Sequence, residues 1–137
     1  MFKILGVDHI GVAVPNLAEA GKFWSETLGL EHTKDETVAD QKVTTGFFPT
    51  ANGAEFELLE ATAPDSPIAK YLEKQGGRTS IQHVAIRVDN LEQAIADLKE
   101  KGVRMIDEKP RKGAGGAMIA FIHPKSSGIL LELCQHD

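Results

Sequence analysis

The chain contains the same sequence pattern twice, and this duplication restricts its fold more than any other feature. Residues 8–20 and 82–94 match at an offset of 74 residues, with histidine, valine, asparagine, leucine and alanine at shared positions. A second matched pair follows, at residues 54–59 and 129–134. A chain of 137 residues normally forms one domain. We therefore predict a single domain, residues 1–137, built from two similar modules.

Each copy predicts the order strand, helix and about three strands, which defines an α+β fold. The first strand alternates, and it places its histidine, His9 or His83, on the face opposite its large apolar residues. The helix that follows begins after Asn16 or Asn90, since asparagine suits the N-cap position. One helix covers only one face of a small sheet, so the faces that carry the histidines are expected to meet. The predicted segments are module 1, a linker helix and module 2, at about residues 5–62, 66–76 and 80–135.

Several element ends follow from the same patterns. In the first helix, the apolar residues at helical spacing extend the buried stripe as far as Leu28. In module 2, residues 103–106 predict a short strand, and residues 109–116 a basic, glycine-rich loop. The last strand is expected at residues 128–134, with Ile129 packed beneath the helix.

Each module carries one histidine and one glutamate at nearly the same separation. His9 precedes Glu57 by 48 residues, and His83 precedes Glu132 by 49. A single histidine or glutamate at such a position more often has only a structural role. Packing, however, does not require both residue types to recur in register in the two modules. Glu132 also interrupts an apolar strand, where an ionised carboxylate needs a partner or a metal ion. Two imidazoles and two carboxylates suit a divalent ion such as Co²⁺, Ni²⁺, Mn²⁺ or Zn²⁺, so we predict a metal site formed by these four residues.

Charge and cysteine content limit the partners and the compartment. The net charge of −5 argues against binding to nucleic acid or to an anionic membrane. No apolar run reaches the length of a membrane span, and no signal peptide is recognisable. Cys134 is the only cysteine, which suits a reducing cytoplasm, and it is expected to be a small buried residue. The remaining histidines are expected at the surface: His32, His123 and His136.

Five segments are distinctive when taken together: residues 8–14 (DHIGVAV), 65–72 (DSPIAKYL), 82–88 (QHVAIRV), 113–116 (GAGG) and 123–133 (HPKSSGILLEL). They closely resemble the methylmalonyl-CoA epimerase family, which belongs to the vicinal oxygen chelate, or glyoxalase-like, superfamily. The resemblance covers nearly the whole chain. The repeated histidine and glutamate alone would indicate only the superfamily, whereas the HPKS and GAGG segments are more specific to the epimerases.

The resemblance implies a fold and an activity. The fold would be two tandem βαβββ modules forming a metal-containing half-barrel cleft, commonly in a homodimer. The activity would be a metal-dependent epimerase of propionate metabolism that interconverts (2R)- and (2S)-methylmalonyl-CoA, an acyl-CoA. The reaction would abstract the proton at C2 and pass through a metal-stabilised enolate, with Co²⁺ as the expected ion.

The resemblance also assigns residues. His9, His83 and Glu132 match metal ligands of the family, and Glu132 is the expected catalytic residue. The fourth ligand position is often glutamine in the family; Glu57 keeps the oxygen donor there and adds a negative charge. Some members carry a glutamate, suggested as a second base, where this chain has Thr45. Residues of the basic loop and of the HPKS segment are the candidates for substrate binding: Arg111, Lys112, Gly115, Gly116 and Lys125.

Three other functions fit the same residues. A glyoxalase I-like lyase would use this kind of metal site on a glutathione hemithioacetal. An extradiol dioxygenase would use Fe(II) with two histidines and one carboxylate, and a fourth protein ligand argues against it. The third is a non-catalytic small-molecule-binding protein of the same fold.

Overall fold

The computed structural model describes residues 1–137, and the chain divides into two compact units. The first unit is formed by residues His9–Gln82. The second unit combines Met1–Asp8 with His83–Asp137. Each unit follows the order strand, helix and three strands, so the predicted βαβββ pattern and the α+β class are confirmed.

The first unit contains four strands and two α-helices. They span Ile4–Ala13 (β1, shared with the second unit), Leu17–Lys22 (α1), Lys34–Val38 (β2), Val43–Pro49 (β3), Glu55–Ala61 (β4) and Pro67–Lys74 (α2). The strand order is β2-β3-β4-β1. Strand β1 is parallel to β4, whereas β3 is antiparallel to both β2 and β4.

The second unit repeats this arrangement. Its elements span Ser80–Val88 (β5), Leu91–Glu100 (α3), Arg111–Lys112 (β6), Met118–Ile122 (β7), Pro124–Ser127 (α4) and Leu131–Gln135 (β8). The strand order is β5-β8-β7-β6, with β5 parallel to β8 and the other pairs antiparallel. None of the helices in either unit combines the length and apolar character that crossing a membrane requires.

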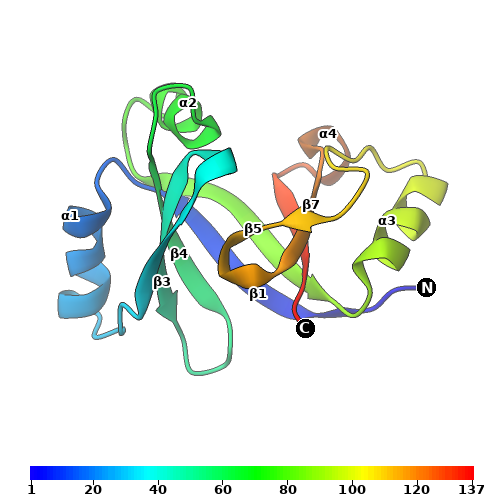
Figure 1. Ribbon diagram of the computed structural model, residues 1–137, viewed down its shortest axis with the longest axis horizontal. Helices are drawn as coiled ribbons and strands as arrows, with labels where there is room; N and C mark the ends of the chain where they lie inside the picture. The colour runs from blue at the N-terminus through cyan, green and yellow to red at the C-terminus, as the bar shows by residue number, and fades with distance from the viewer. The chain divides into compact units, whose positions relative to one another are not determined.

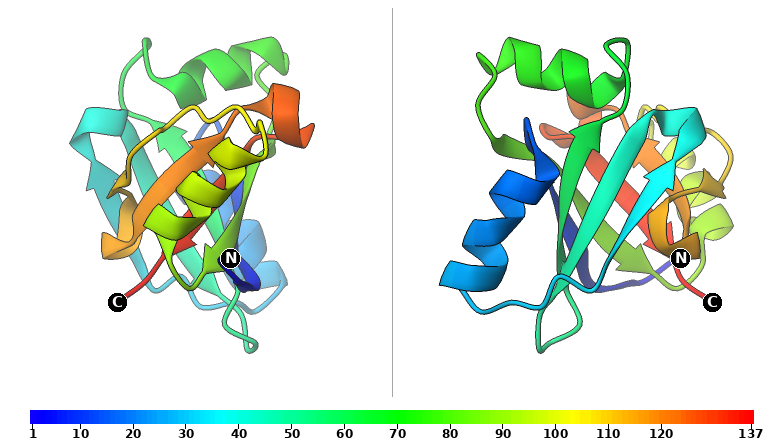
Figure 2. Two further views of the ribbon diagram at one scale, coloured as in Figure 1. Left: turned by 90° about the vertical axis from the view of Figure 1, so that its right-hand side faces the viewer. Right: turned by 60° about the vertical axis from the view of Figure 1, so that its left-hand side comes forward.

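Helix α1 packs on one face of the first unit's sheet, and α2 on the other. The side chain of Asn16 caps α1 by accepting a hydrogen bond from the backbone N–H of Glu19 at 2.8 Å. Figure 1 shows α1 beside β3 and β4, and Figure 2 shows α2 near the ends of these strands. The core under α1 consists of Val12, Val14, Leu17, Phe48 and Leu58. The core under α2 consists of Ala13, Val43, Leu59, Ile68 and Leu72.

Helix α3 packs on the equivalent face of the second unit. Its cap is Asn90, whose side chain accepts from the backbone N–H of Gln93 at 3.0 Å. Figure 2 shows α3 lying across β7 and β8. The core under α3 consists of Val88, Leu91, Ala94, Ile95, Ala120, Ile122 and Leu133. Alternation leaves the opposite face of this sheet to His83 and Glu132, as predicted.

The prediction that the buried stripe of the first helix extends to Leu28 is wrong. Leu28 is 53% exposed. The α-helix stops at Lys22 and continues as a π-helical turn over Phe23–Thr27, in which the Leu28 N–H bonds to the Phe23 carbonyl at 3.0 Å. A π-turn adds a residue to the repeat, so the 3.6-residue spacing no longer places Leu28 over the sheet.

Two strand predictions in module 2 are also wrong. Residues 103–106 form only a single bridge, between Met105 and Ile122, and the short strand β6 lies instead inside the predicted basic loop. The last strand begins at Leu131 rather than residue 128, and Ile129 is 53% exposed. Gly128, with φ of 82°, ends α4 in the left-handed conformation and turns the chain before β8.

Candidate functional site

In the first unit, His9 and Glu57 form a buried pair. Strand β1 lies parallel to β4, with Gly11 directly opposite Glu57, so the histidine stands two residues before the position that faces the glutamate. His9 Nδ1 lies 3.2 Å from Glu57 Oε2. Both residues are buried, with exposed fractions of 6% and 5%.

In the second unit, His83 and Glu132 form the same kind of pair. Ala85 lies opposite Glu132, and His83 again stands two residues earlier on its strand. His83 Nε2 lies 3.5 Å from Glu132 Oε1, and both residues are buried. A phenylalanine from the antiparallel neighbour faces each glutamate: Phe47 faces Glu57, and Phe121 faces Glu132.

The donor atoms of each pair suit a divalent cation. Burying an ionised carboxylate is costly unless a positive charge or hydrogen bonds compensate it. Imidazole nitrogen and carboxylate oxygen are ligands of borderline divalent ions. Each unit therefore supplies one buried nitrogen donor and one buried oxygen donor within 4 Å of each other. The residues present fit half of a metal site in each unit.

Thr45 lies on the same face of the first unit's sheet as Glu57, because it is two residues from Phe47 on β3. It is 1% exposed and faces Leu59. In the second unit the corresponding position is Ile119, which faces Cys134. A threonine hydroxyl is not basic enough to accept a carbon-bound proton, so this position offers no second base.

The predicted substrate-binding residues occupy two parts of the second unit. Arg111 and Lys112 form β6, and only Arg111 is partly buried. Gly115 and Gly116 have φ of 73° and 78° in the exposed turn that follows. Lys125 is exposed on the short helix α4.

His123 caps this helix rather than lying free at the surface. Its Nδ1 accepts a hydrogen bond from the backbone N–H of Lys125 at 3.0 Å. Burial and the positive charges of Arg104 and Lys125 lower the pKa of His123. The neutral ring is therefore favoured, which leaves its Nδ1 able to accept.

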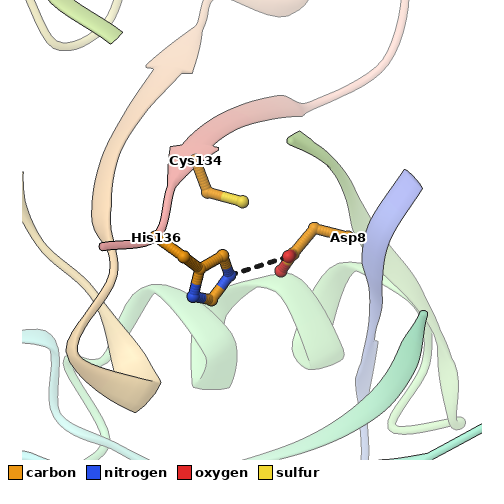
Figure 3. Close-up of side chains that lie close together, drawn as sticks. All are labelled: Asp8, Cys134 and His136. Atoms are coloured by element: carbon orange, nitrogen blue, oxygen red, sulfur yellow. Dashed lines mark hydrogen bonds and ion pairs between the residues drawn. The ribbon is translucent and has the colours of Figure 1, made fainter. Parts of the chain in front are cut away.

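A polar cluster on the second unit was not predicted. Asp8 Oδ1 accepts hydrogen bonds from Arg87 Nε and Nη2 at 3.0 and 2.7 Å, and lies 2.8 Å from His136 Nε2. Figure 3 shows His136 pointing toward Asp8, with Cys134 beside them. His136 is exposed, as predicted, but it also has Asp8 as a partner. Arg87 was the available signal, since an arginine at an inward position of a strand needs a buried anion.

His32 is exposed at the surface, as predicted. Its ring stacks on Phe48, with centroids 4.5 Å apart, and its Nε2 lies 2.5 Å from Asp35 Oδ1. His32 therefore packs against the first unit's core from the surface.

Cys134 is fully buried, as predicted, and its environment makes it unreactive. Burial, followed by the carboxylates of Asp8 and Glu132, raises the pKa of the thiol far above its usual range. We expect a thiol-specific reagent to label the folded protein much more slowly than the urea-unfolded protein at pH 8, because only the thiolate reacts. Equal labelling rates in the two states would contradict this environment.

Comparison with known proteins agrees with the repeated architecture. Residues 8–121 match the model of the Glyoxalase/Bleomycin resistance protein/Dioxygenase superfamily. The uncharacterized protein YqjC of Bacillus subtilis is 40% identical, over 94% of this chain and 91% of that protein. The mitochondrial methylmalonyl-CoA epimerase of Bos taurus is 39% identical, over 94% of this chain and 73% of that protein.

A solved structure extends the likeness to three dimensions. A methylmalonyl-CoA epimerase in complex with methylmalonyl-CoA and NH4+ is 33% identical, with a TM-score of 0.89 over 97% of this chain and 95% of that one. The two βαβββ units, each with a buried histidine–glutamate pair, thus define a protein of the glyoxalase superfamily. Within that superfamily, the chain belongs to the methylmalonyl-CoA epimerase family, a family of isomerases.

Proposed function

We propose that this protein interconverts (2R)- and (2S)-methylmalonyl-CoA by removing and returning the proton at C2. The observation that carries the proposal is the buried histidine–glutamate pair found in equivalent positions of both units. Family membership supports the choice of substrate, since a solved relative holds methylmalonyl-CoA. Neither the lyase nor the dioxygenase alternative has an observation of its own in this structure.

His9, Glu57, His83 and Glu132 are the proposed ligands of one divalent ion. The support is the match between the two pairs in register, burial and donor type. Co²⁺ is the ion expected, and Ni²⁺, Mn²⁺ and Zn²⁺ also suit these donors. When bound, such an ion supplies Lewis-acid stabilisation of negative charge on the substrate.

Glu132 is the proposed carrier of the C2 proton. That proton lies between a thioester and a carboxylate, so its removal gives a delocalised enolate. A carboxylate can accept the proton and return it, which is general acid–base catalysis. Inversion requires a carrier on the opposite face of the planar intermediate, and Glu57 is the candidate because Thr45 cannot serve.

The acyl-CoA is proposed to contact Arg111, Lys112, Gly115, Gly116 and Lys125. The exposed ammonium groups of Lys112 and Lys125 suit phosphates. The positive-φ turn at Gly115 and Gly116 follows Lys112 closely in the sequence, and backbone N–H groups in such turns can also bind phosphate. The mobile ends of long lysine side chains also allow them to follow a flexible ligand.

A homodimer is part of the same proposal. The start of β1 exposes Ile4, Leu5 and Val7, with exposed fractions of 60%, 60% and 52%. Several large apolar side chains exposed in one short segment are typical of an interface between proteins. Action in the cytoplasm and a role in propionate metabolism remain predictions from the sequence.

Solvent-deuterium exchange tests the function directly. The purified protein is incubated with one epimer of methylmalonyl-CoA in D₂O, and deuterium at C2 and epimer composition are followed together. We expect exchange and interconversion well above the rate without protein. Binding without exchange would indicate the non-catalytic alternative, while lactoylglutathione formation from a hemithioacetal would indicate a glyoxalase.

A further inference from the structure

Two contacts hold the guanidinium of Arg111 in place on the second unit. Its Nε donates to Asp107 Oδ1 at 3.0 Å, and its Cζ lies 5.6 Å from the centroid of the Phe121 ring. The other oxygen of Asp107 accepts from the backbone N–H of Phe121 at 2.9 Å. One carboxylate therefore positions both the cation and the strand that carries the ring.

The same ring connects Arg111 to the His83–Glu132 pair. Phe121 meets His83 edge to face, with centroids 5.6 Å apart and planes at 81°. Phe121 also faces Glu132 across the β7–β8 ladder. A single aromatic ring thus separates the guanidinium from the residues proposed to handle C2.

The guanidinium retains donors for a ligand. Asp107 uses only Nε, and both Nη groups lie at the other edge of the planar cation. The side chain is 38% exposed, so the surrounding residues do not fully enclose the guanidinium. Two parallel N–H groups match a carboxylate, and this bidentate pairing is stronger than contact with an ammonium group.

The position of Arg111 distinguishes among the anionic groups of the substrate. The phosphates of coenzyme A are separated from the thioester by the long pantetheine arm. The free carboxylate of the acyl group is bonded directly to C2. A cation one ring away from His83 and Glu132 suits that carboxylate, and it also offsets the repulsion between the carboxylate and the buried Glu132.

We infer that Arg111 binds the free carboxylate of the acyl group and so selects malonyl-type thioesters over simple acyl thioesters. The inference rests on the proposed function, because it takes C2 to lie beside the His83–Glu132 pair. It gives Arg111 a different role from the next residue, Lys112, whose exposed side chain remains a candidate for binding the phosphates. Asp107 and Phe121 act as positioning residues for Arg111.

Equilibrium binding of two ligands tests this inference. Methylmalonyl-CoA and propionyl-CoA differ only in the carboxylate, and their Kd values are measured by calorimetry on the metal-loaded protein. We expect the wild type to prefer methylmalonyl-CoA. Arg111→Gln should raise the Kd of methylmalonyl-CoA about 10- to 100-fold and leave the Kd of propionyl-CoA nearly unchanged, because only methylmalonyl-CoA loses a charged hydrogen bond. Arg111→Lys should recover part of the loss.

Lys112→Gln is the matched comparison, and it should weaken the binding of both ligands equally. The inference would be overturned if Arg111→Gln weakened the binding of both ligands equally, or of neither. It would also be overturned if the wild type bound propionyl-CoA as tightly as methylmalonyl-CoA. Metal content and the thermal midpoint show whether the Arg111 variants are folded. Selective binding without C2 exchange would refute the proposed epimerase activity while leaving the role of Arg111 intact.

Discussion

Replacing Glu132 with glutamine is expected to slow C2 exchange by about 10²- to 10⁴-fold, the range typical of a lost general acid–base group. Glutamine has nearly the same size and keeps an oxygen donor, so the buried site beside His83 should remain filled. It cannot accept and return a proton. The loss should therefore appear in kcat, with a smaller change in KM, since the interaction removed is one made in the transition state.

The matched control is Glu57→Gln in the other unit. Glu57 has the same register, burial and histidine contact as Glu132, so the two substitutions perturb folding and metal binding in similar ways. The resemblance places glutamine at this position in many family members, so we expect Glu57→Gln to keep most of the C2 exchange, which Glu132 can perform alone, and to slow only inversion, which needs the second carrier. Metal content is measured for both variants. An equal loss of exchange in the two would refute Glu132 as the principal proton carrier.

The faces of the strands were predictable because their side-chain period is two. Once His9 and His83 are seen to alternate with large apolar residues, the helix that follows each strand must cover the apolar face, and the structure confirms this for α1 and α3. The register between β1 and β4, and between β5 and β8, follows from the same buried faces. The histidine–glutamate pairs inside each unit could therefore be predicted from the repeat.

Contacts made by irregular segments could not be predicted in this way. Asp107 lies in a stretch without strand pairing, yet its two oxygens join Arg111 to Phe121. His136 lies beyond the last strand, and only the three-dimensional position of Asp8 gives it a partner. Such contacts depend on where loops return to the sheet, and a periodic pattern carries no information about that path.

Removal of divalent metal is expected to abolish C2 exchange and to destabilise the protein at the same time. Lewis-acid stabilisation is worth several kcal/mol, which corresponds to a loss on the order of 10³-fold. A ligand bound only by the folded state at 100 times its Kd adds about 2.7 kcal/mol to stability. The chelated protein should therefore melt at a lower temperature, since Glu57 and Glu132 remain buried without the cation.

Readdition of Co²⁺ should restore both properties in parallel, and Ni²⁺, Mn²⁺ and Zn²⁺ added separately would rank the ions. The two measurements are informative because they report different things: exchange follows the chemistry, and the melting temperature follows occupancy of the four residues. In a His83→Ala variant, the melting temperature should no longer respond to Co²⁺, because the ion has lost one of its two nitrogen ligands. Exchange that continues unchanged after complete chelation would exclude the metal-dependent mechanism, whereas loss of exchange with an unchanged melting temperature would place the ion outside these four residues.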